Sequence, residues 1–241
     1  MGDYAGNEKK HSKSAEMKRV IDFLAKLQVN NNREWFEANK VEYKEALLVF
    51  NTFVEKLITG ITSFDPTIEG LTLKDCTYRI YRDIRFSHDK RPYKHHMGAY
   101  ICRGGKKSGY GGYYFHIEPE GDGLIGGNLI SSGIYMPEPK VLSSVRDEIY
   151  DNGAQFTAAI KKAKGFQMDM GNSLTRVPKG YPQDSEYAEY LKLKDIYLVK
   201  FFPNDYILDK NLLDNLIKEY KTTKEFLDIT NRAAAFAFEE M

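Results

Sequence analysis

Residues 79–94 gather arginine, lysine, aspartate and tyrosine side chains at close spacing. In an extended chain, Arg79, Asp83 and Arg85 project from one face, with Tyr81 between them. Guanidinium groups bind planar anions such as phosphate and carboxylate through paired hydrogen bonds. This segment is therefore the candidate site for an anionic ligand.

The side chains of this segment that can hold an anion or stack on it are assigned as binding residues: Arg79, Tyr81, Arg85, Lys90, Tyr93 and Lys94. Arg79 and Arg85 lie roughly 20 Å apart along a strand, at ~3.3 Å per residue, too far for one phosphate. We therefore expect Asp83 and Arg85 to form the core of the site, with Lys90 and Lys94 folded back across a proline turn. Arg79 then serves an extended ligand or an ion pair. The alternative is an ion-pair network that only holds the chain in register.

Asp83 and His116 are the candidate acid or base beside such an anion. No nucleophile–base pair can be recognised from spacing, so no mechanism is assigned. His95 and His96 are adjacent and would point apart on a strand. His116 and Glu118 share one strand face but supply only two ligands, so we assign no metal and no cofactor.

Composition narrows the choice of partner. The chain has 241 residues, 35 basic and 34 acidic, with a net charge of +1. This balance does not favour nucleic acid, whose non-specific binders carry a strong basic excess. A small anionic ligand of an enzyme or binding protein is the main hypothesis. An interaction module for nucleic acid or an acidic protein segment is the alternative, and the oligomeric state stays open.

Two cysteines, Cys76 and Cys102, cannot supply a disulfide framework. No stretch reaches the ~18–20 apolar residues of a membrane span. The polar N-terminus lacks the apolar core of a signal peptide. These observations predict a soluble, cytoplasmic protein that makes no use of a membrane.

The elements that position these residues follow from hydrophobic periodicity. Residues 1–14 are predicted to be a disordered tail and residues 15–241 a single domain, since no linker is recognisable. Helical spacing predicts helices over about 15–28 and 35–57, with Gly60 just beyond the second. Asn30, Asn31 and Asn32 offer caps between them.

A change of period to two predicts a strand at 76–86, with Ile80, Ile84 and Phe86 packed against helices. Further strands are predicted at about 97–103, 111–118, 123–130 and 196–202. A closing helix pair or one long helix is predicted at about 208–239. Glycine-rich turns favour antiparallel pairing. The order of elements predicts an α+β fold, with a central and mainly antiparallel sheet flanked by helices from both ends of the chain.

Several spaced motifs accompany the 79–94 run in matching order, at residues 31–36, 112–119, 133–138, 178–181 and 191–194. Together they resemble a bacterial and fungal family of conserved hypothetical proteins, domain of unknown function 2461, over about residues 20–227. The resemblance implies no reaction, cofactor or partner. It implies that residues 79–94 are the hallmark of the family, which favours a functional site there.

Overall fold

The structure is a computed structural model that describes residues 5–121 and 125–239. Its centre is an antiparallel sheet of strands in the order β1-β2-β3-β5-β4. The strands are β1 (Met97–Cys102), β2 (Gly112–Ile117), β3 (Asn128–Ile134), β4 (Gln167–Met168) and β5 (Ile196–Phe202).

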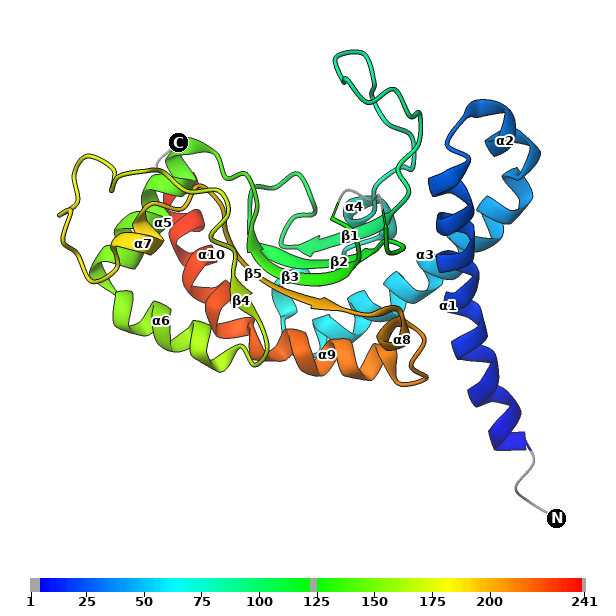
Figure 1. The fold of residues 1–241 in the computed structure, drawn as a ribbon. Helices are drawn as coiled ribbons and strands as arrows, with labels where there is room; N and C mark the ends of the chain where they lie inside the picture. The colour runs from blue at the N-terminus through cyan, green and yellow to red at the C-terminus, as the bar shows by residue number, and fades with distance from the viewer. Residues whose placement is uncertain (1–4, 122–124, 240–241) are drawn as a thin grey trace.

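Helices precede and follow this sheet in the chain. The N-terminal elements are α1 (Ala5–Val29), α2 (Arg33–Ala38), α3 (Lys40–Thr62), the 3-10 helix η1 (Pro66–Ile68) and α4 (Leu73–Cys76). The later helices are α5 (Pro139–Asp151), α6 (Gly153–Lys162), α7 (Ala188–Leu191), α8 (Asn204–Ile207), α9 (Leu212–Thr222) and α10 (Lys224–Glu239). Figure 1 shows α3, α9 and α10 along one side of the sheet, with α1 packed on α3. The predicted α+β architecture is confirmed.

The two faces of the sheet differ in chemistry. On the helix-packed face, the ring of Phe50 stacks 6.2 Å from that of Phe115, and Tyr113 meets Tyr220 edge to face at 5.3 Å. Because side chains alternate along a strand, Tyr100, Tyr114 and His116 point to the opposite face. We call this opposite side the second face of the sheet.

The helices confirm the predicted order but not every boundary. Asn32 caps α2, since its side chain accepts a hydrogen bond of 2.9 Å from the backbone N–H of Trp35. The predicted tail, 1–14, falls partly on residues 1–4, outside the described residues, and α1 begins at Ala5. Gly60 was predicted to lie just beyond the second helix, but it lies inside α3. A Cβ there would come within 2.3 Å of Ile217, so glycine lets α9 approach α3 closely.

The strand predicted at 76–86 is wrong. Cys76 ends the short helix α4, and Thr77 makes only one isolated bridge, to Ala99. Ile80 is buried as predicted, but Ile84 is only half-buried and Phe86 is 94% exposed. The alternation of polar and apolar residues over 76–86 does not correspond to a buried face of the sheet, because the chain leaves the sheet after Thr77. Strand β3 also begins later than the strand predicted at 123–130.

Cys76 and Cys102 are both free and buried. Burial raises the pKa of Cys76 to about 12 and that of Cys102 to about 11, so both stay protonated thiols. Within residues 5–121 and 125–239, no helix is long and apolar enough to span a bilayer.

Candidate functional site

Residues 77–96, the hallmark loop, leave the sheet between α4 and β1 and project beyond it (Figure 1). The two arms of the loop are held by few backbone contacts. Tyr81 bridges Tyr93, the N–H of Arg82 donates to the carbonyl of Pro92 at 2.9 Å, and the N–H of Lys94 donates to Ile80 at 2.8 Å. Beyond this root the loop is irregular.

The root of the loop is anchored by an aromatic cluster. Tyr93 is 4% exposed and its ring stacks on Phe36 at 3.9 Å, with 13° between the planes. Its backbone exchanges two hydrogen bonds with the side chain of Asn31, of 2.9 and 3.1 Å. Tyr81, 44% exposed, contacts the edge of the same Phe36 ring at 5.9 Å. Tyr93 therefore holds the loop rather than facing a ligand.

At the exposed tip, Asp83 and Arg85 bind each other. The Nε and Nη2 atoms of Arg85 donate to the Asp83 carboxylate at 2.9 and 2.6 Å. These hydrogen bonds hold the pKa of Asp83 below its usual value, which makes this carboxylate a poor general base. The Nζ of Lys90 donates to the carbonyl of Ile84 at 3.2 Å.

A second ion pair closes the loop below the tip. Asp89 accepts hydrogen bonds from Arg91 and Arg82, the latter at 2.7 Å. Both arginines, Arg91 first, hold the pKa of Asp89 well below its usual range. Arg85, Lys90 and Lys94 have separate contacts, so the predicted core of the anion site does not form as expected. This part of the hallmark loop fits the ion-pair alternative.

Lys94 and Arg79 lie in a different environment. Lys94 is half-buried, and burial lowers the pKa of its ammonium group, with further lowering from Arg79 and Arg82. Its Nζ lies 5.4 Å from the centre of the Tyr78 ring, which Lys106 also approaches at 5.9 Å. Lys94 and Arg79 form no ion pair with any carboxylate of the described residues. Positive charge therefore accumulates around Tyr78.

Next to this charge, two buried histidines, His95 and His116, and the partly exposed His96 surround one carboxylate. Glu118 and His116 are 0% exposed and His95 is 6% exposed. The Nε2 of His116 lies 3.4 Å from Oε2 of Glu118, and the Nδ1 of His96 lies 3.9 Å from Oε1. The candidate ligand atoms of His96, His116 and Glu118 all lie within 4.8 Å of one another. We call these three residues the His/Glu cluster.

The end of β2 and the loop after it fix Glu118. Its Oε2 atom accepts hydrogen bonds from the backbone N–H groups of Ile125 and Gly126, at 2.8 and 2.9 Å. Its own N–H donates to the side chain of Asn128, which in turn donates to Asn204 on α8 at 2.8 Å. The loop after β2 thus holds the carboxylate of Glu118, while Asn128, supported by Asn204, holds its backbone.

Tyr114 orients the ring of His116. Its hydroxyl shares a hydrogen bond of 2.9 Å with Nδ1 of His116, which leaves Nε2 directed at Glu118. Gly98 lies opposite His116 in β1, and a Cβ there would come within 2.6 Å of the Tyr114 hydroxyl. The absence of a side chain at Gly98 therefore gives Tyr114 room to reach the histidine.

His96 stacks on His116, with ring centres 4.7 Å apart, and is the most exposed member of the cluster, its side chain 14% exposed. Burial and the neighbouring His116 lower the pKa of His96 to about 3, and Lys94 contributes to this shift. His96 is therefore a neutral imidazole at physiological pH. The Nδ1 atom of His96 and both ring nitrogens of His95 are buried with no hydrogen-bond partner in the described chain.

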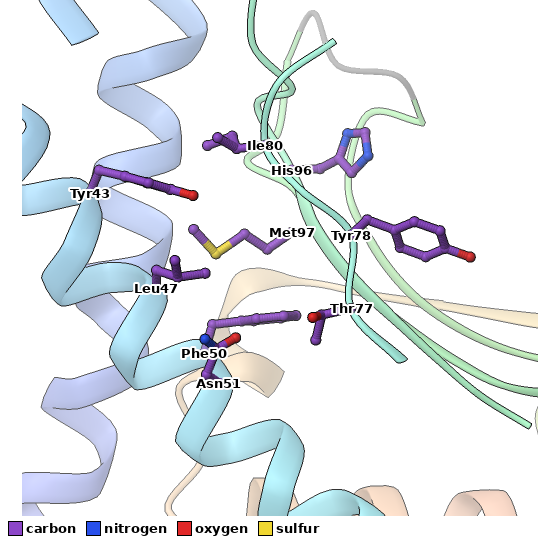
Figure 2. Close-up of a pocket in the computed structure, with 9 residues that line it drawn as sticks. All are labelled: Tyr43, Leu47, Phe50, Asn51, Thr77, Tyr78, Ile80, His96 and Met97. Atoms are coloured by element: carbon purple, nitrogen blue, oxygen red, sulfur yellow. The ribbon is translucent and has the colours of Figure 1, made fainter. Parts of the chain in front are cut away.

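A small pocket lies on the other side of this segment. Figure 2 shows it between α3 and residues 77–97, lined mainly by Tyr43, Leu47, Phe50 and Met97. The rings of His96 and Tyr78 point away from α3, toward the second face of the sheet. The pocket also has polar lining residues, Asn51 and Thr77 among them, and it borders the His/Glu cluster at His96.

Strand alternation predicted that His116 and Glu118 share one face, but not that His96 joins them. His95 and His96 were predicted to point apart as strand residues, whereas both precede β1, which begins at Met97. The antiparallel pairing of β1 with β2 is the signal that could have found His96. It brings His96, just before β1, next to His116, near the end of β2.

The fold and these residues define a class: an α+β domain whose antiparallel sheet carries a buried histidine and glutamate cluster and a projecting cationic loop. The chain belongs to the family of conserved hypothetical proteins DUF2461, whose model matches residues 19–228. No curated protein and no solved structure matches the chain.

Proposed function

We propose that the protein binds a small phosphate- or carboxylate-bearing ligand at Lys94 and Arg79, beside the Tyr78 ring. The observation that carries this proposal is the half-buried ammonium group of Lys94 beside the guanidinium groups of Arg79 and Arg82. Of the three, only Arg82 has an ion-paired carboxylate among the described residues, that of Asp89. Such an arrangement is unfavourable unless an anion completes it. Residues Arg85 and Lys90, at the tip, are not needed for this ligand.

The position of Lys94 supports an enzyme over a simple binding protein. Lys94 is close enough to His96 to contribute to lowering the pKa of its imidazole. A ligand bound at Lys94 would therefore lie beside His96, His116 and Glu118, whose side chains can exchange protons or bind a cation. His116 remains a candidate acid or base, whereas Asp83 does not, because Arg85 binds both of its oxygens.

One observation favours a second function, a protein interaction module. Phe86 is 94% exposed at the loop tip, next to Arg85, whose side chain is 76% exposed. Exposed aromatic and arginine side chains are typical anchors of protein interfaces. An acidic protein segment fits this tip better than nucleic acid does, because the net charge of the chain is only +1.

Binding of an anion should stabilise the native state in a way that depends on Lys94. At a ligand concentration 100-fold above Kd, the stabilisation is about 2.7 kcal/mol, a rise in Tm of about 5–10 °C for a chain of this length. We expect Lys94→Met to lose this shift with phosphate, nucleotides or dicarboxylates, and Arg85→Ala to keep it. Thermal unfolding across such a panel measures both. If only Arg85→Ala loses the rise in Tm, the anion binds at the tip of the loop and not at Lys94.

The pH dependence of stability offers a ligand-free test of the same environment. The folded-state pKa of Lys94 is lowered, so its charged form is less favourable in the folded than in the unfolded chain. This penalty is present in full at neutral pH and is lost as the pH rises from the lowered pKa of the folded state to the pKa of the unfolded chain. Without a ligand, Lys94→Met should therefore be more stable than the wild type at pH 7, and the difference should shrink at alkaline pH. A less stable Lys94→Met variant contradicts the proposed charge environment.

A further inference from the structure

We propose that His96, His116 and Glu118 bind a divalent transition-metal ion, with Zn²⁺ or Fe²⁺ as the expected class. Two imidazoles and a carboxylate suit these borderline ions better than Mg²⁺ or Ca²⁺, which prefer sites made of oxygen alone. The inference does not depend on the anion proposal, because it rests on different side chains.

The distances fit such a site. Metal–ligand bonds of about 2.0–2.2 Å in a tetrahedral arrangement place neighbouring ligand atoms about 3.3–3.6 Å apart. Nε2 of His116 lies 3.4 Å from Oε2 of Glu118, and Nδ1 of His96 lies 3.9 Å from the other oxygen, Oε1. All three candidate donors lie within 4.8 Å of one another. A small movement of the His96 ring is enough to bring three donors around one ion.

The surroundings of the cluster match those of a metal site rather than those of an ordinary buried polar cluster. Nδ1 of His96 is buried without a hydrogen-bond partner among the described residues, an unfavourable state that a metal bond would relieve. Nδ1, the other ring nitrogen of His116, shares a hydrogen bond with the hydroxyl of Tyr114. Histidine ligands of metals usually have such a hydrogen-bonded second nitrogen. Glu118 is held in turn by the N–H groups of Ile125 and Gly126.

Three protein ligands leave at least one coordination position for water or another molecule, as in catalytic rather than structural zinc sites. His96 is the partly exposed member, so we expect the open position on its side of the cluster. His95 is a neighbour rather than a ligand: its Nε2 lies 3.3 Å from Oε1 of Glu118, but it does not belong to the group whose donors converge.

The cysteines do not compete for this ion. Cys102 pairs with Gly112 at the far end of the β1–β2 ladder from the Gly98–His116 pair. Both thiols are also held protonated by burial, whereas a metal takes the thiolate. The bound metal should therefore show nitrogen and oxygen ligands without sulfur.

The test uses the full chain without a polyhistidine tag, stripped with a chelator and titrated with ZnCl₂ by calorimetry and with CoCl₂ by visible absorption. We expect one ion per chain. His96→Ala, at the most exposed ligand, should weaken Zn²⁺ binding by more than the ~10–100-fold that loss of a supporting partner causes. Tyr114→Phe, which removes only the support of His116, should fall within that range. His88→Ala, at an exposed histidine of the loop, should bind like the wild type.

Folding is monitored separately, by circular dichroism and by the rise in Tm that Zn²⁺ produces in the wild type and not in His96→Ala. Glu118→Gln keeps the size of the side chain and serves as a second ligand variant if His96→Ala misfolds. X-ray absorption on the zinc-loaded wild type reports the ligand atoms. The proposal is overturned if the wild type binds no Zn²⁺ or Co²⁺, if sulfur ligands are found, or if His95→Ala abolishes binding and His96→Ala does not.

Discussion

Tyr93→Ala should lower the free energy of unfolding by about 3–5 kcal/mol, the usual cost of truncating a buried aromatic side chain. The ring is 4% exposed, stacks on Phe36 and contacts Tyr81 at 5.5 Å. Its removal leaves a cavity between α2 and the root of the hallmark loop. Urea denaturation measured by circular dichroism gives the change, which is a large part of the ~5–15 kcal/mol that stabilises a typical domain.

Phe86→Ala is the matched control, an aromatic truncation in the same loop. Phe86 is 94% exposed, so we expect a change within about 0.5 kcal/mol. The contrast separates a structural root from an exposed tip within one sequence motif. Equal effects of the two substitutions would show that the tip packs against the body of the protein in solution.

The sequence predicted the sheet and the helices well where burial alone sets the pattern. Strand β5, Ile196–Phe202, and the helix pair after it follow from apolar runs and helical spacing. The hallmark loop shows where this logic fails. Alternation of polar and apolar residues from Cys76 to Phe86 imitates a strand, but the segment has no neighbouring strand to pair with beyond one bridge. The alternation of polar and apolar residues indicates the direction of the side chains, but not whether a neighbouring strand is present for pairing.

Only part of the candidate site could be predicted from the sequence, for a related reason. The shared direction of His116 and Glu118 is a property of one strand, so alternation was enough to find it. The approach of His96 depends on the register between β1 and β2, which only the folded chain sets. The charge motif stands out in the sequence, but its ion pairs, Asp83 with Arg85 and Asp89 with Arg91, neutralise much of it. The turn of the loop carries Lys94 back to the sheet, and this is the part of the motif to which we assign the proposed ligand.

The substitution Gly133→Ala should destabilise the protein to a degree similar to Tyr93→Ala. Gly133 lies in β3 between two paired strands, with a φ of 144° that side chains rarely adopt. A Cβ there would come within 2.2 Å of the carbonyl oxygen of Ile196 and 2.5 Å of the Cα of Tyr197. These are backbone atoms of β5, so no side chain can move aside to relieve the overlap.

The strain of the backbone and the overpacking of the sheet each cost roughly 1–3 kcal/mol, so we expect Gly133→Ala to lose about 2–6 kcal/mol in urea denaturation. The carbonyl of Gly133 also accepts a 2.7 Å hydrogen bond from the hydroxyl of Tyr100, so a shift of β3 disturbs the second face of the sheet. Gly127→Ala is the control, because a Cβ at Gly127 meets no atom within 4 Å and its φ is not in the left-handed region. If Gly133→Ala is as stable as Gly127→Ala, then β3 and β5 are not packed as closely as the register requires, and the position that β3 gives to Asn128 and Glu118 must be revised with it.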